Sequence, residues 1–167
     1  MNKIEWLILL LQANDYEPIK GITKFEKLLF YYLKKQNMAD IALFQFQPYN
    51  FGPHSDDIRD LLYALRDNGI IEITPRETDN FLEIDDVEED QEELLPINYN
   101  KQESYNLTQK GKEVAKKVMK KFDKIELLNS YKKKFNRMSL TKLIQIVCLE
   151  YPDMAINSKI KGIIGVQ

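Results

Sequence analysis

The stretch that most restricts the fold is FGPHSDDIRDLLYALRDNGIIEIT, residues 51–74, where a helix pattern passes directly into a strand pattern. Gly-Pro at 52–53 predicts a turn, and Ser55 is the expected N-cap of a helix with two aspartates in its first turn. Apolar residues recur at helical spacing over 58–65, and Gly69 suits the left-handed residue that ends a helix. The strand begins at once, so helix and strand must be fixed against each other.

A second strand pattern, SYNL at 104–107, returns after a segment of different composition. Residues 83–93 contain eight acidic side chains and no glycine, and repulsion between these charges favours an extended loop. A calcium loop is not expected, because it would need glycine and alternating ligand spacing. The pattern therefore predicts a helix followed by a hairpin with a long acidic loop.

The N-terminal part contains two longer helical patterns. The first runs from Asn2 or Lys3 to Ala13 with apolar residues on one face, and the second follows TKFE at 23–26, which has the form of a capping box. A short helical piece is expected near MADIALF, followed by a brief strand that Pro48 should end, because proline cannot donate to a strand ladder.

The C-terminal part is helical. Thr108 is the expected cap of a helix to about Phe122, and two further helical patterns follow, the last closed by Pro152. Cys148 lies in an apolar helical pattern and is expected to be a buried thiol; a single cysteine excludes an internal disulfide. The apolar run at 6–11 is far shorter than the roughly 20 residues of a membrane span, so the chain is expected to be cytoplasmic and soluble.

The net charge of −2 conceals a strong asymmetry. Residues 1–100 carry 9 basic and 20 acidic side chains, whereas residues 101–167 carry 15 basic and 6 acidic ones. Such asymmetry is typical of a chain with a nucleic-acid surface at one end, but it also lets two halves attract each other on folding.

The segments LRDNGII and YNLTQKG resemble a pattern shared by many winged-helix proteins, in which a leucine-rich helix runs into Gly-Ile-Ile and the wing closes with Tyr-x-Leu-Thr-x-x-Gly. The matching residues are Leu65, Gly69, Ile70, Ile71, Tyr105, Leu107, Thr108 and Gly111. We therefore expect an α+β, mostly helical fold. It would comprise a winged helix-turn-helix core at 1–108, with an acidic wing loop at 75–103, and a C-terminal helical extension at 109–167 packed on that core.

A narrower resemblance covers residues 22–71. ITKFEKLLFYYLKK and FQPYNFGPHSDDIRDLLYAL are similar to the lysine-leucine-tyrosine helix and the Tyr-x-x-Gly-Pro turn of the Panacea (SocA-like) antitoxin domain and of YwgA-like small bacterial proteins. The matching residues are Lys24, Lys27, Leu28, Leu29, Tyr31, Tyr49, Gly52, Pro53 and Ser55. The resemblance implies a bacterial, archaeal or phage protein with a partner encoded beside it. The acidic insertion and the lysine-rich C-terminal helices depart from the antitoxin pattern.

The first functional hypothesis is a non-enzymatic regulatory protein that binds a protein partner, as an antitoxin or a defence-associated accessory would. The predicted reading helix presents four carboxylates against Arg59 and Arg66, which opposes contact with DNA phosphates. The acidic loop could instead occupy the basic site of a partner such as a toxin or a nucleic-acid enzyme. The candidate partner-binding residues are Asp56, Asp57, Asp60, Tyr63, Asp85, Asp86, Glu88 and Glu89.

The alternative hypothesis is a winged-helix transcription regulator, expected to be dimeric, that contacts DNA phosphates through a lysine-rich helix. Lysine without patterned arginine favours phosphate contact over base readout, although an ordinary solvated helix face has the same composition. The candidate nucleic-acid-binding residues are Lys110, Lys112, Lys116, Lys117, Lys120, Lys121, Lys132, Lys133, Lys134 and Arg137.

The sequence contains little that points to catalysis. It has no glycine-rich phosphate loop, nucleophile elbow or paired-carboxylate site, so no catalytic residue, metal or cofactor is expected. His54, the single histidine, lies in the Gly-Pro turn and is interpreted as a turn residue, with a pH-sensing or ligand-binding role as the alternative. Ser55 has no base to activate it and is interpreted as a helix cap.

Overall fold

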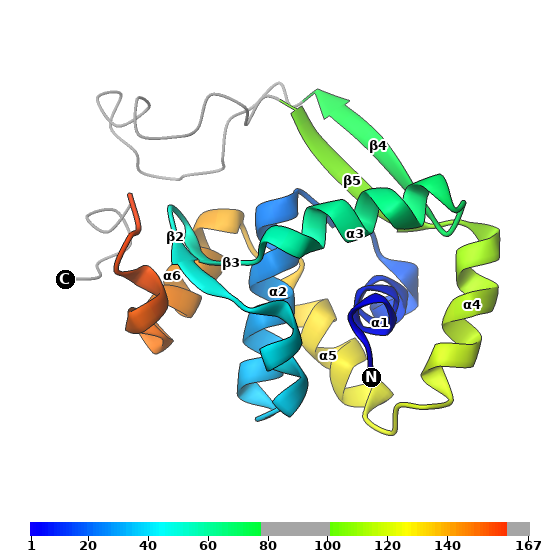
Figure 1. The fold of residues 1–167 in the computed structure, drawn as a ribbon, viewed down its shortest axis with the longest axis horizontal. Coiled ribbons are helices and arrows are strands. Elements are labelled where there is room, and N and C mark those ends of the chain that lie inside the picture. Colours follow the sequence, from blue (N-terminus) through cyan, green and yellow to red (C-terminus); the bar gives the residue numbers. More distant parts are fainter. Residues whose placement is uncertain (78–100, 160–167) are drawn as a thin grey trace.

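A computed structural model describes residues 1–77 and 101–159 of the chain and shows a predominantly helical α+β fold (Figure 1). The expected fold class, α+β and mostly helical, is therefore confirmed. The helices are α1 (Lys3–Tyr16), α2 (Ile22–Lys35), α3 (Asp56–Asp67), α4 (Gln109–Met119), α5 (Ile125–Phe135) and α6 (Leu140–Glu150), with short 3-10 helices η1 (Ala39–Phe44) and η3 (Pro152–Ala155). The strands are β1 (Ile19–Lys20), β2 (Gln47–Tyr49), β3 (Gly52–His54), β4 (Ile71–Glu77) and β5 (Lys101–Leu107).

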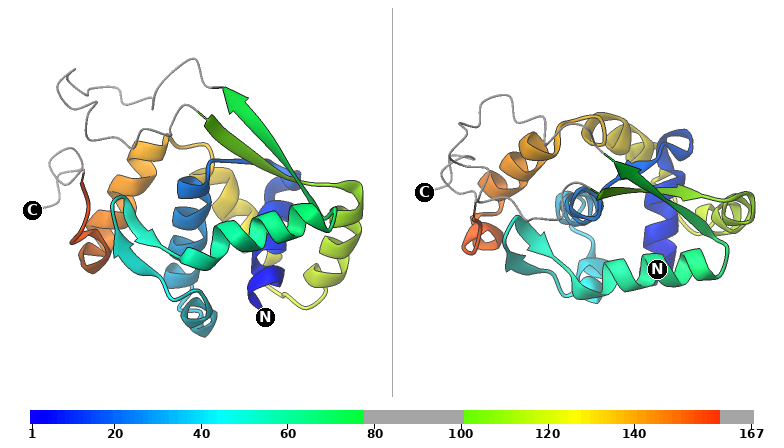
Figure 2. Two further views of the ribbon diagram at one scale, coloured as in Figure 1. Left: turned by 45° about the horizontal axis from the view of Figure 1, so that its top comes forward. Right: turned by 90° about the horizontal axis from the view of Figure 1, so that it is seen from above.

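Helix α1 is enclosed by other elements of the fold. Every residue from Trp6 to Ala13 is buried, because α4, α5 and β5 pack around it (Figures 1 and 2). The sequence pattern predicted a helix with one apolar face, and in this respect the prediction was incomplete. A helix that is apolar all round must be enclosed, and the C-terminal helices provide part of the enclosure.

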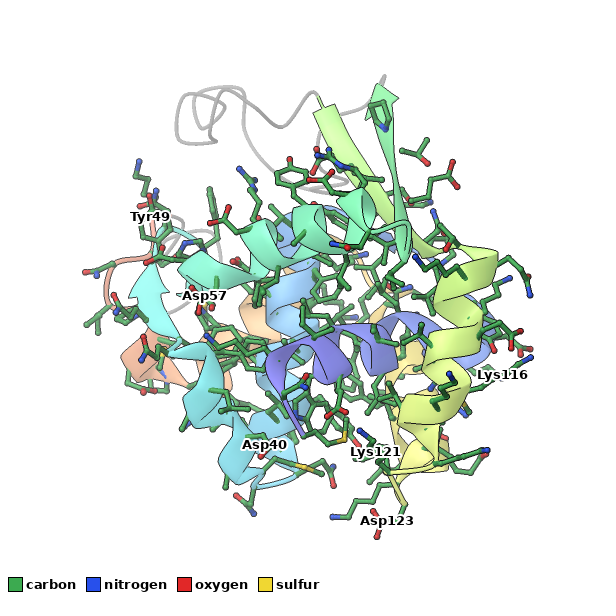
Figure 3. The ribbon with its side chains drawn as sticks, turned by 45° about the vertical axis from the view of Figure 1, so that its right-hand side comes forward. Asp40, Tyr49, Asp57, Lys116, Lys121 and Asp123 are labelled. Carbon is green, nitrogen blue, oxygen red and sulfur yellow. The ribbon has the colours of Figure 1, made fainter. Side chains whose placement is uncertain are left out.

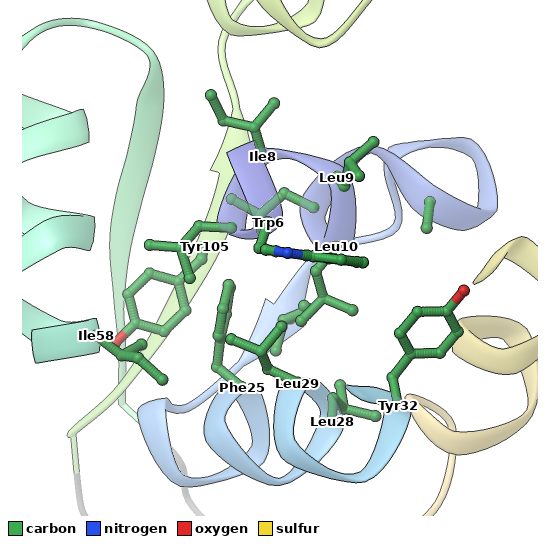
Figure 4. Close-up of a cluster of buried hydrophobic side chains, with 14 of the residues drawn as sticks. Trp6, Ile8, Leu9, Leu10, Phe25, Leu28, Leu29, Tyr32, Ile58 and Tyr105 are labelled. Atoms are coloured by element: carbon green, nitrogen blue, oxygen red, sulfur yellow. The ribbon is translucent and has the colours of Figure 1, made fainter. Parts of the chain in front are cut away.

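The core around α1 combines residues from both halves of the chain. Trp6 packs edge-on against Phe122, with ring centroids 5.4 Å apart, and Phe25 packs edge-on against Tyr105 at 5.9 Å. Figure 4 shows Trp6, Phe25 and Tyr105 in this cluster. Val118, Leu128, Leu143 and Val147 belong to the same buried cluster.

The larger sheet has the strand order β1–β5–β4 and is antiparallel throughout. Ile19 and Ile73 both pair with Tyr105, so the strand before α2 is joined to the β4–β5 hairpin. The predicted strands on either side of the acidic loop are confirmed. Most of that loop lies outside the described residues, including four predicted site residues, Asp85, Asp86, Glu88 and Glu89.

Two glycines of the sequence pattern lie where the chain enters and leaves this hairpin, and the structure explains both. Gly69 has φ +71° and ends α3, as expected. A Cβ at Gly111 would lie 2.0 Å from the carbonyl oxygen of Ile70, so α4 can approach the start of β4 only with glycine there. The Thr108 hydroxyl accepts a hydrogen bond from the Gly111 amide at 3.0 Å, which confirms the predicted cap of α4.

Two local predictions in the N-terminal part were wrong. The N-cap of α2 is Gly21, which has no side chain to cap the helix, and the Glu26 carboxylate contacts His54 instead of the helix start. Pro48 does not end a strand: it lies within β2 and pairs with Pro53 in the β2–β3 hairpin. Proline is tolerated there because this two-stranded hairpin consists of edge strands only.

None of the helices in the described part of the chain combines the length and the apolar composition needed to cross a membrane.

Candidate functional site

A pocket of about 320 Å³ opens where α2, the β2–β3 hairpin and α3 meet. It combines charged side chains from all three segments with an apolar wall. Its lining residues are Ile22, Thr23, Glu26, Lys27, Tyr49, Phe51, His54, Asp56 and Arg59. Three residues of the Panacea-like pattern, Tyr49, Gly52 and Pro53, belong to the hairpin that builds one side of it.

The inner wall of the pocket is a buried ion pair. Lys27 Nζ lies 3.6 Å from Glu26 Oε2 and donates a hydrogen bond to the carbonyl oxygen of Pro53 at 2.8 Å. Both side chains are at most 5% exposed. Burial lowers the pKa of Lys27, and the adjacent Glu26 charge opposes this shift. The pair therefore ties α2 to the hairpin.

His54 lies between two carboxylates. Its Nδ1 is 2.8 Å from Glu26 Oε1 and its Nε2 is 3.1 Å from Asp56 Oδ1. Hydrogen bonding to Glu26 raises the pKa of His54, burial opposes this, and Asp56 adds to it. The Tyr49 ring stacks on the imidazole with centroids 4.8 Å apart. Because each ring nitrogen faces an acceptor, the doubly protonated imidazolium satisfies this geometry best.

The Gly-Pro turn is required by the packing behind the pocket. Gly52 has φ +91°, and a Cβ there would lie 3.1 Å from Cys148 Sγ. Cys148 is buried and free, as predicted. Ser55 precedes α3 as expected, but its hydroxyl does not cap the helix; it donates to the carbonyl oxygen of Phe44 at 2.7 Å. Ser55 thus anchors η1 to the start of α3.

The predicted partner-binding residues of α3 divide into two groups. Three of them contact other parts of the molecule: Asp56 contacts His54, Asp57 pairs with Lys3, and the Tyr63 hydroxyl donates to Glu103 Oε1 at 2.8 Å. Asp60 is exposed and forms no hydrogen bond or ion pair with the described residues. Arg59 is likewise exposed, and it also lines the pocket.

Four of the nine predicted nucleic-acid-binding lysines lie on α4 and two directly follow it, and several of these six are engaged. Lys110 donates to the carbonyl oxygen of Asn68 at 2.9 Å, and Lys112 Nζ lies 4.8 Å from the Tyr16 ring centroid. Lys116 pairs with Glu113 at 2.9 Å, and Lys121 pairs with Glu5 at 2.5 Å.

Two further lysines, one on α4 and one at its C-cap, are unengaged. Lys117 and Lys120 are exposed and form no ion pair within the described part of the chain. We use the term lysine ridge for Lys116, Lys117, Lys120, Lys121 and Lys124. Figure 3 shows that Lys116 and Tyr49 lie on opposite sides of the molecule, so the ridge and the pocket are separate surfaces.

The predicted nucleic-acid-binding residues on α5 and directly after it differ in exposure and in their contacts. Lys133 is exposed, Lys134 Nζ lies 5.1 Å from the Phe135 ring centroid, and Arg137 pairs with Glu17 at 3.4 Å. Lys132 is 0% exposed and cannot contact nucleic acid, so its assignment to that surface was wrong.

Lys132 is buried because its amino group binds backbone carbonyls at the end of α1. Its Nζ donates to the carbonyl oxygens of Leu11 at 3.0 Å and of Glu17 at 2.5 Å. Between these carbonyls the backbone is left-handed at three successive residues, with φ of 52° at Asn14, 55° at Asp15 and 59° at Tyr16. Burial lowers the pKa of Lys132 to about 7, and the Glu17 charge opposes this shift. Lys132 thus holds an unusual turn in place.

Sequence reasoning missed Glu26, Lys27 and Arg59 as parts of one site. A signal was present: Glu26 and Lys27 interrupt a run that is otherwise apolar and aromatic, and a charged pair in such a run must be paired or exposed. Among the described residues, no group of three or more His, Cys, Asp or Glu side chains is arranged to hold a metal ion.

Comparison with known proteins adds no assignment: the chain matches no protein-family model and no curated protein.

Proposed function

We propose that this chain is a non-enzymatic regulatory module of winged-helix type that binds a protein partner, in the manner of an antitoxin or a defence-associated accessory protein. The binding surface would be the pocket face, which we define as Tyr49, Asp56, Arg59, Asp60 and the pocket beside them. The observation that carries the proposal is a preformed polar pocket with the exposed Arg59 in its lining and the exposed Asp60 beside it, neither of which forms an ion pair with the described residues.

The winged-helix part of the proposal is supported by the order of elements. The elements α1, β1, α2, α3, β4 and β5 follow one another in this order, with η1 and the β2–β3 hairpin inserted between α2 and α3. The short β1 pairs with β5, so the β4–β5 hairpin lies beside it. That is the connectivity expected of a winged helix, with α3 in the position of the reading helix and β4–β5 as the wing.

The charge of α3 supports a protein partner over DNA. Its exposed side chains include Asp56, Asp60 and Asp67 against Arg59 and Arg66. Arg66 already pairs with Asp67 at 3.0 Å. A helix in the major groove has phosphates on both sides, so each exposed carboxylate opposes binding.

Affinity purification of the tagged full chain from native cells at low salt, with and without nuclease, tests the proposal. We expect a stoichiometric protein that survives nuclease and is lost from the Asp60→Lys variant. Glu126→Lys makes the same charge change at an exposed position of α5 and should retain the partner. Absence of any protein companion, or equal capture by Asp60→Lys, would contradict the proposal.

Nucleic-acid binding is the second candidate, because Lys117 and Lys120 are exposed, one helical turn apart and free of ion pairs within the described residues. Lysines that neutralise phosphates release counterions, so the affinity must fall steeply as salt rises. The Lys116/Lys117/Lys120→Glu variant should abolish such binding to duplex DNA. A flat salt dependence, or unchanged binding by this variant, would exclude it.

A further inference from the structure

We propose that the pocket binds the carboxylate of an acidic side chain of the partner, with Arg59 as the residue that holds it. This inference rests on the proposed function and specifies the chemistry by which the pocket face recognises its partner. Three properties of the pocket carry it: its internal charge pairing, its remaining hydrogen-bonding groups and its walls.

Pairing within the pocket leaves one uncompensated charge. Glu26 is matched by Lys27, and Asp56 is matched by the imidazolium of His54. Arg59 lines the same pocket and forms no ion pair with the described residues. A guanidinium is always charged, so with His54 protonated the pocket presents one net positive charge to a ligand.

The hydrogen-bonding groups of the pocket also favour an anionic ligand. Glu26 Oε1 faces His54 Nδ1 at 2.8 Å and the Ser55 amide at 3.5 Å, and Glu26 Oε2 faces Lys27. The buried carboxylate therefore has little capacity left to accept from an entering cation. The donors that remain in the lining are the five N–H groups of Arg59 and the hydroxyls of Thr23 and Tyr49, for which a ligand with acceptor oxygens is the complement. The second oxygen of Asp56 is an acceptor, but it lies at the exposed rim.

A carboxylate fits better than a phosphate. A planar carboxylate accepts two parallel hydrogen bonds from a guanidinium, and a single negative charge matches the single unpaired positive charge. A phosphate dianion would carry a second charge close to Asp56, which is 92% exposed at the rim, and on the same helix as Asp60. Ile22, Tyr49 and Phe51 supply apolar walls for the carbon atoms that carry the carboxylate.

The test is a titration of the isotope-labelled full chain, followed by NMR, with N-acetyl-aspartate N-methylamide as the carboxylate probe. The matching asparagine derivative and inorganic phosphate serve as comparison ligands. We expect saturable shifts at Thr23 and His54 with the carboxylate probe, and none with its uncharged counterpart. Arg59→Gln should weaken binding about tenfold or more, whereas Arg66→Gln, the same change on the same helix, should leave it unchanged.

The inference is overturned if the carboxylate probe does not saturate, if Arg59→Gln binds it as the unmodified chain does, or if phosphate binds more tightly. Partner capture separates this inference from the proposed function. Equal capture of a protein by the unmodified chain and by Arg59→Gln would refute the carboxylate site and leave the proposed function intact. A pocket that binds the probe in a chain that captures no protein would support the site and refute the proposed function.

Discussion

His54 Nδ1 lies 2.8 Å from Glu26 Oε1, so the hairpin and α2 are joined by a hydrogen bond that is strongest when the imidazole is protonated. Asp56, at the start of α3, faces the other ring nitrogen. One imidazole thus connects the three segments that form the pocket, and its charge couples their arrangement to pH.

Stability should depend on pH through this histidine. Its folded-state pKa is raised above the ordinary value of 6.5, so its stabilising contribution is fully present below 6.5 and is lost as pH rises through the folded pKa. The difference in free energy of unfolding between the unmodified chain and His54→Gln should therefore be largest just below pH 6.5 and shrink as pH rises through the folded-state pKa. Denaturant titrations at several pH values measure this.

The role of His54 in this pH dependence can be checked directly, because the chain has a single histidine and its NMR titration is unambiguous. Asp56→Asn should lower the pKa of His54, since Asp56 contributes to the upward shift. A difference in stability that grows with pH, or a titration unaffected by Asp56→Asn, would contradict the arrangement.

Lys132→Met should destabilise the fold by about 1–3 kcal/mol, because the carbonyl oxygens of Leu11 and Glu17 would lose their donor in a buried site. Lys133→Met is the matched control on the neighbouring, exposed residue and should change stability by no more than about 0.5 kcal/mol. Chemical denaturation measures both. If the two variants behaved alike, Lys132 would not hold the end of α1.

The same lysine should give a second pH effect of opposite sign. Its folded-state pKa is lowered from 10.5 to about 7, so between these values the unfolded chain binds a proton that the folded chain does not. Stability contributed through Lys132 therefore rises with pH in this range. The free energy of unfolding of the unmodified chain, relative to that of Lys132→Met, should increase from about pH 7 to pH 10. A constant difference would show that Lys132 stays charged in the fold.

The features that could be predicted from the sequence are those set by neighbouring residues. Thr108 and Gly69 act within a few positions of themselves, as cap and as left-handed terminator, and both predictions were confirmed. The strand patterns at 70–74 and 104–107 are local in the same way, although the strands continue to Glu77 and begin at Lys101, in residues assigned from the sequence to the acidic loop.

The features that could not be predicted depend on partners far along the chain. Lys132 and Leu11 are 121 positions apart, and nothing near Lys132 distinguishes it from Lys133 or Lys134 except its spacing of four residues from the buried Leu128. Glu26 matched a capping box locally but faces a histidine 28 positions away. The pocket depends on such long-range pairs, which is why sequence reasoning found its individual residues but not the site.

Gly111→Ala should destabilise the fold by about 2 kcal/mol or more, although alanine favours helices, because the new Cβ would clash with backbone that cannot move aside easily. Gly69→Ala is an informative comparison: the nearest atom to a new Cβ would be Lys110 Cδ at 4.0 Å, without a clash, so only the left-handed backbone opposes the change, at a cost of about 1 kcal/mol. Thermal or denaturant unfolding ranks the two variants by their stability. A milder effect at Gly111 than at Gly69 would contradict the close approach of α4 to β4.

A chain that ends at residue 108 should not fold cooperatively. It would lack α4, α5 and α6, and with them the Phe122, Leu128 and Val147 side chains that cover α1 and α2. Trp6 is the single tryptophan and is 1% exposed, so its fluorescence reports the loss of Phe122 from its ring edge. We expect red-shifted emission and a broad unfolding curve for the truncated chain, against a sharp transition for the full chain. A sharp transition with buried Trp6 emission in residues 1–108 would show instead that the N-terminal part is an independent unit and that the C-terminal helices are an appendage.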